Sequence, residues 1–68
     1  MKMTWQDVDE LAGALASRYP DMNPLSIEVK ELETLITGLT EFGDDPASAT
    51  RSSLQAIQEA WYERFEGG

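Results

Sequence analysis

Apolar side chains recur at three- and four-residue intervals in three stretches of the chain. In the first, residues 4–19, this spacing gathers the apolar side chains on one side of a helix. Its members are Trp5, Val8, Leu11, Ala12, Leu15 and Tyr19. Thr4 is followed three residues later by Asp7, which suits a capping arrangement. The pattern therefore predicts a first helix over this stretch.

A turn-forming segment follows, because residues 19–24 read YPDMNP and proline, aspartate and asparagine favour turns. Pro20 also biases the residue before it away from helical geometry. Beyond the turn, Leu25, Ile27 and Val29 alternate with polar residues, which is the period-two pattern of a strand. We expect the chain to reverse here and then to run extended, over too short a length to form a sheet alone.

The second apolar stretch runs from about Glu31 to Leu39 and predicts a second helix. Its stripe consists of Leu32, Leu35, Ile36 and Leu39. Gly38 and Gly43 weaken and then end the helical pattern. We expect Phe42 to pack back onto the core.

The third stretch is the clearest amphipathic segment, and Ser48 or Thr50 can cap it. One face carries Leu54, Ile57, Trp61 and Phe65, and the other carries Gln55, Glu59, Glu63 and Glu66. Helices this short need tertiary packing, so the three stretches predict a mainly α, compact three-helix domain with at most a minimal strand pair. We expect a single domain over residues 1–68, with Gly67 and Gly68 as a frayed tail.

Composition supports a folded protein with an acidic surface. Of the 68 residues, 41% are hydrophobic, which is too many for a disordered tail. Thirteen acidic against five basic residues give a net charge of -8. Phosphate backbones repel such a surface, so nucleic acid is not the expected partner. A basic protein surface or a cation fits the charge, and both attractions would weaken with salt.

Histidine and cysteine are absent from the sequence, which excludes disulfides, thiolate zinc sites and cluster ligation by this chain. Serine and threonine residues have no evident base beside them, so we expect no enzyme. The start, MKMTWQDVDE, lacks the apolar segment of a signal peptide, and no apolar run approaches the roughly 20 residues needed to span a bilayer. We therefore expect a cytoplasmic protein.

Three site types that suit small acidic proteins do not fit. DDPASATRSSLQ lacks the glycine and terminal glutamate of a calcium loop. The Asp-Ser-Leu of an acyl carrier has only Ser52-Ser53-Leu54 as a counterpart, and the glycine pair at the end belongs in other proteins to a β-grasp fold. The adjacent Asp44 and Asp45 can cap a helix, hold a metal or face a basic partner.

The acids late in the third helix oppose its macrodipole, so something besides helix stability favours them, unless they only form a solvated face.

Several motifs, taken in order, resemble the IscX family, the small acidic protein of bacterial iron-sulfur cluster assembly. They are Trp5-x-Asp7, Ala14-Leu15, Tyr19-Pro20-Asp21, Pro24, Leu39-x-x-Phe42, Asp44-Asp45-Pro46, Leu54-x-Ala56-Ile57 and Trp61. The resemblance spans nearly the whole chain without gaps.

The resemblance implies a winged-helix-like monomer that docks on the cysteine desulfurase as an adaptor or regulator, with the scaffold or ferredoxin of the pathway as further candidate partners. It also implies weak surface binding of iron, Fe2+ or Fe3+, and no tightly bound cofactor. The candidate iron ligands are Asp7, Glu10, Asp21, Asp44 and Asp45. The candidate partner-binding residues are Asp9, Tyr19, Pro20, Asp44, Asp45, Glu59 and Glu63.

The chain departs from the family pattern at four positions. Asn23 and Arg51 stand where the family has acids, Gly43 lies in a stretch that is often acidic, and Val29 replaces an aromatic residue. Iron binding through positions 23, 43 or 51 is therefore not implied. Two alternatives remain: an acidic interaction module unrelated to iron, and a winged-helix nucleic-acid module, against which the lack of a basic recognition helix argues.

Overall fold

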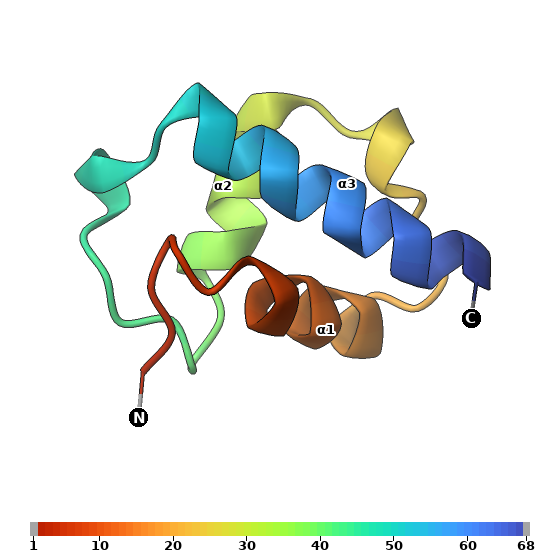
Figure 1. Ribbon diagram of the computed structural model, residues 1–68, viewed down its shortest axis with the longest axis horizontal. Helices are drawn as coiled ribbons and strands as arrows, with labels where there is room; N and C mark the ends of the chain where they lie inside the picture. Colours follow the sequence, from red (N-terminus) through yellow and green to blue (C-terminus); the bar gives the residue numbers. More distant parts are fainter. Residues whose placement is uncertain (1, 68) are drawn as a thin grey trace.

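The computed structural model describes residues 2–67 and contains three α-helices joined by two short 3₁₀ turns (Figure 1). In chain order these are α1 (Val8–Arg18), η1 (Pro24–Ser26), α2 (Val29–Thr37), η2 (Pro46–Ser48) and α3 (Arg51–Gly67). The β structure within residues 2–67 is a single parallel bridge between Met3 and Phe42. This confirms the predicted mainly helical, three-helix class, and the expected strand pair is reduced to that one bridge.

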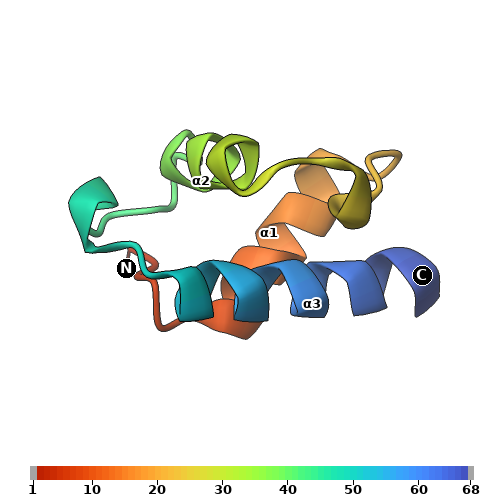
Figure 2. The ribbon, with the colours of Figure 1, turned by 90° about the horizontal axis from the view of Figure 1, so that it is seen from above.

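The core lies between the three helices. In Figure 2, α3 runs along one side of the molecule and α2 lies on the opposite side. The predicted apolar stripes meet there, and the residues of the buried core cluster are Met3, Trp5, Leu11, Ala12, Leu15, Leu32, Ile36, Leu39, Leu54, Ile57 and Trp61. Phe65, which continues the stripe of α3, is 36% exposed because it lies beyond this contact region. Phe42 packs against the core as expected.

The first helix begins at Val8, so the predicted start at residue 4 is wrong. Thr4 and Asp7 do bond to each other, since Asp7 Oδ2 accepts from Thr4 N at 2.9 Å and from Thr4 Oγ1 at 3.3 Å, while Thr4 Oγ1 accepts from Gln6 N at 3.3 Å. That arrangement closes a turn ahead of α1. Trp5 is 3% exposed and lies outside the helix, where its ring meets that of Phe42 edge-on at 4.7 Å.

The predicted extended run over residues 25–29 is also wrong. Asn23 caps η1 by accepting from Leu25 N at 3.0 Å, while Ser26 Oγ donates to Asn23 O at 2.8 Å. Only Ile27 and the residue after it keep extended backbone angles before α2 begins. The alternation of apolar residues did not reflect a strand, because Asn-Pro starts a turn.

Thr50 caps α3, since its Oγ1 accepts from Ser53 N at 3.1 Å. Ser48, the alternative cap, belongs to η2 instead. The second helix ends at Thr37, with Gly38 as its C-cap. α3 continues to Gly67, and Gly68 lies outside the described residues.

Candidate functional site

The start of the chain is bound to the segment between α2 and η2. Met3 N donates to Glu41 O at 2.7 Å, and Gly43 N donates back to Met3 O at 2.9 Å. Lys2 Nζ adds a hydrogen bond to Thr40 O at 3.1 Å. These contacts bring Asp44 and Asp45 beside the segment that precedes α1.

Asp44 is half-buried, and both its oxygens accept hydrogen bonds. Its Oδ2 accepts from Trp5 N at 3.3 Å, and its Oδ1 accepts from Asp45 N at 2.7 Å. The Asp45 carboxylate is exposed and caps η2, with Oδ1 accepting from Ala47 N at 3.0 Å. The Asp45 carbonyl accepts from the indole Nε1 of Trp5 at 2.8 Å. The pair therefore has a structural role, and the exposed Asp45 is the freer of the two carboxylates.

The predicted iron ligands divide between the two ends of α1. Asp7 lies on the same side as Asp44. Its carboxylate accepts from Thr4 N, and the Asp44 carboxylate accepts from the next main-chain donor, Trp5 N. Glu10 is exposed in the first turn of α1. Asp21 follows the far end of this 11-residue helix, roughly 16 Å along its axis. Within residues 2–67 no three acidic side chains gather closely enough to hold a metal ion.

The predicted partner-binding residues outside the Asp44–Asp45 pair lie on α1, on α3 and in the loop after α1. Asp9 is exposed in the first turn of α1, whereas Glu59 and Glu63 are exposed on α3. Tyr19 and Pro20, after the end of α1, line two adjoining hollows. One, of about 320 Å³, also involves Trp61, Arg64 and Phe65, and the other, of about 550 Å³, involves Asp21, Met22, Asn23 and Ser26.

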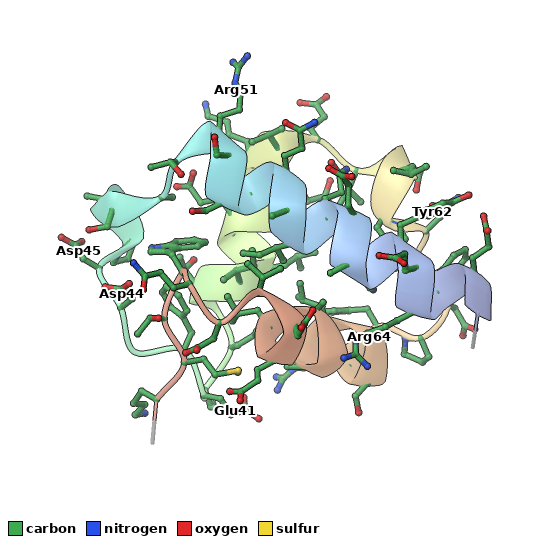
Figure 3. All side chains as sticks on the ribbon, viewed as in Figure 1. Glu41, Asp44, Asp45, Arg51, Tyr62 and Arg64 are labelled. Carbon is green, nitrogen blue, oxygen red and sulfur yellow. The ribbon has the colours of Figure 1, made fainter. Side chains whose placement is uncertain are left out.

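Two of the basic side chains bind main-chain oxygens. Lys2 donates to Thr40 O. Arg64, labelled in Figure 3, donates through Nη2 to Asp9 O at 3.4 Å. The chain has 13 acids and five bases, so at least eight acids would lack a basic partner even if every base were paired. The exposed surface therefore keeps a strong excess of negative charge.

Glu41 is an acid that sequence reasoning did not single out. Its pKa is lowered, first because its own main-chain N–H hydrogen-bonds the carboxylate and then because the Thr40 hydroxyl donates to it at 3.0 Å. Burial opposes this shift, and the charges of Arg18 and Lys2 add to it. Nothing in the sequence around Glu41 and Gly43 indicates that Lys2, far earlier in the chain, lies against this segment.

Tyr62 shows the opposite effect near the end of α3. Its hydroxyl shares a hydrogen bond with Glu66, and this bond together with the negative charge of Glu66 raises the phenol pKa. Both effects favour the protonated phenol.

None of the helices described within residues 2–67 combines the length and the apolar character needed to cross a membrane.

Comparisons with known proteins agree with this acidic helical domain. The model of a family described as "Iron-sulphur cluster assembly" matches residues 3–66. An uncharacterized protein of Pseudomonas aeruginosa is 36% identical over 63 residues, which span 93% of this chain and 96% of the relative.

Proposed function

The chain belongs to the iron-sulphur cluster assembly family, and we propose that it serves this process as a non-catalytic adaptor or regulator that docks on the cysteine desulfurase. Membership confirms the family that the sequence motifs indicated. In this proposal the chain works as a monomer in the cytoplasm, binds through acidic side chains and carries iron weakly as cargo.

The observation that carries the proposal is the exposed excess of acids. Asp9 and Glu10 on α1 and Glu59 and Glu63 on α3 all reach solvent. With a net charge of -8, such a surface would accelerate encounter with a basic patch and set the orientation of docking. Charge complementarity of this kind needs no catalytic group on the adaptor.

Titration of the protein with the cysteine desulfurase at low and high salt tests the proposal. We expect binding at low salt that weakens at high salt, because screening shortens the range of the attraction. One double variant, Asp9→Asn with Glu10→Gln, removes the two acids of α1, and another, Glu59→Gln with Glu63→Gln, removes two of the three acids of α3. At least one should weaken binding several-fold.

A matched control removes two charges from α2 through Glu31→Gln and Glu33→Gln. This control changes the net charge equally but leaves the proposed docking residues intact. It should weaken binding less than the more sensitive of the two test variants. Absence of binding at both salt concentrations, or equal weakening by all three variants, would reject the proposed docking surface.

Iron binding is the second part of the proposal, supported by the adjacent carboxylates of Asp44 and Asp45, with Asp7 bonded to the same segment before α1. Because no three acids within residues 2–67 form a cage, the site would be shallow. Oxygen ligands suit iron, but pairs of carboxylates without a cage bind it weakly. Asp44→Asn with Asp45→Asn keeps the hydrogen-bond acceptors and removes the charges, unlike substitution by alanine. Anaerobic calorimetry with ferrous iron should show a weak heat signal that this variant loses.

Glu31→Gln with Glu33→Gln is the matched control for iron, because it also removes two carboxylates, but from α2 and outside the candidate ligands. It should retain most of the binding heat. Full retention of binding in the Asp44 and Asp45 variant would place the iron elsewhere, and tight stoichiometric binding would contradict the shallow site.

A further inference from the structure

A shallow groove lies where the first turns of α2 and α3 approach each other. We call it the Val29–Arg51 groove; Val29, Arg51, Gln55 and Gln58 line it, around a hollow of about 360 Å³. Figure 3 shows Arg51 extending outward from the first turn of α3, away from Asp44 and Asp45. The groove is thus separate from Asp44 and Asp45, whereas Glu59 on α3 directly follows its lining residue Gln58.

Two large apolar side chains at or near this groove are unusually exposed. Val29 is 49% exposed, and Leu25, on the neighbouring η1, is 56% exposed. They are the two most exposed large hydrophobic residues within residues 2–67. Both stand outside the buried stripe of α2, so the core does not account for their apolar character.

Polar groups in the groove are partly fixed in position. Gln58 Nε2 donates to Pro24 O at 2.8 Å, which ties η1 to α3 and orients the amide. The Gln58 carbonyl oxygen can then accept from a main-chain N–H of a bound segment, and the exposed Gln55 amide can both donate and accept. Two amide side chains on one helix edge suit the backbone of an extended peptide.

The charge of the groove is opposite to that of the chain. Its lining includes a guanidinium and no carboxylate, although acids outnumber bases 13 to five in the whole sequence. Glu28 and Lys30, on either side of Val29, are both exposed and carry opposite charges, so Arg51 is the charged group of the lining itself. A guanidinium binds carboxylates through paired, charge-assisted hydrogen bonds, so a carboxylate is the group that this groove is best suited to receive.

We propose that the Val29–Arg51 groove binds a short extended segment of another protein in which an aliphatic side chain stands next to a carboxylate. The aliphatic group packs on Val29, the carboxylate pairs with Arg51, and the peptide backbone bonds to the two glutamines. This recognition is the reverse of desulfurase docking, where the acids belong to this chain. No residue of α1 lines the groove, so desulfurase docking through Asp9 and Glu10 would leave it open and let the chain join two partners.

Two synthetic octapeptides test the groove: one with alternating leucine and aspartate, and one with asparagine in place of each aspartate. Titration into ¹⁵N-labelled protein should shift the Val29 amide and the side-chain amides of Gln55 and Gln58. The acidic peptide should bind several-fold more tightly than its neutral counterpart despite the net charge of -8. Arg51→Gln should abolish this preference, and Val29→Ser should weaken both peptides.

Lys30→Gln is the matched control, because it removes the same charge from an exposed residue outside the lining and should keep most of the preference. Arg51 and Val29 are exposed, so both variants should keep the wild-type circular dichroism. Three results would overturn the proposal: no binding of either peptide, shifts confined to other surfaces, or an unchanged preference in Arg51→Gln. Shifts that depend on protein concentration without peptide would instead assign the groove to a second copy of the chain.

Discussion

From the sequence, Asp44 could cap a helix, hold a metal or face a basic partner, and the structure adds a role that none of these describes. Its carboxylate accepts from Trp5 N, 39 positions earlier in the chain, and from the N–H of the next residue. A sequence pattern reveals adjacent acids but not which main-chain donors will meet them. For this reason the exposed acids could be predicted from charge, whereas the binding of Asp44 to the start of the chain could not.

Gly43 provides the prediction at this scale. A Cβ added there would overlap Lys2 Cβ and lie 2.6 Å from Lys2 Cγ, atoms too close to the backbone to move freely. Gly43→Ala should therefore loosen the Met3–Phe42 bridge and lower the free energy of unfolding by about 1–3 kcal/mol, the usual cost of overpacking. Urea denaturation followed by tryptophan fluorescence measures this change.

Gly13→Ala is the control for that variant. Its added Cβ would lie 3.6 Å from the Arg64 guanidinium carbon, an ordinary contact, and alanine favours a helix interior. It should leave stability unchanged or raise it by up to about 1 kcal/mol. Equal effects of the two substitutions would mean that the Lys2 contact does not constrain position 43.

At the scale of elements, periodicity predicted what depends on burial and missed what depends on long-range contacts. The apolar stripes of all three helices were found because each faces the core. The start of α1 was misplaced because Trp5 fits the helical spacing but is held by Phe42 and Asp45, which follow α2 in the chain. The false strand arose because Leu25 and Val29, both exposed, mimic alternation.

The start of α3 yields the prediction for an element. Ser48 and Thr50 were equal candidates in the sequence, and the structure assigns the cap to Thr50. Thr50→Ala should lower the free energy of unfolding by about 1 kcal/mol, because Ser53 N loses its acceptor. In a domain of this size that corresponds to a fall in Tm of about 4–8 °C, measurable by circular dichroism.

Ser48→Ala is the control that tests whether Thr50, rather than Ser48, caps α3. Surface substitutions away from such contacts stay within about 0.5 kcal/mol, so its Tm should remain near that of the wild type. A larger loss from Ser48→Ala than from Thr50→Ala would place the cap at the earlier residue.

At the scale of the whole molecule, the excess of acidic over basic residues is the dominant electrostatic feature. The principal extents are 29 × 23 × 16 Å, and the net charge is -8. At about 10 mM salt the Debye length is roughly 30 Å, as long as the molecule, so every acid repels every other. At about 150 mM it falls to roughly 8 Å, and repulsion is limited to neighbours.

The folded state should therefore become more stable as sodium chloride is added. Self-repulsion destabilises the compact state more than the expanded chain, and screening relieves it. Tm measured by circular dichroism should rise between about 10 and 150 mM salt. The Glu59→Gln and Glu63→Gln variant, with two fewer charges, should show a smaller rise. A Tm that falls with salt would mean that attractive pairs outweigh the repulsion, and the acids would then be committed within the fold rather than available to a basic partner.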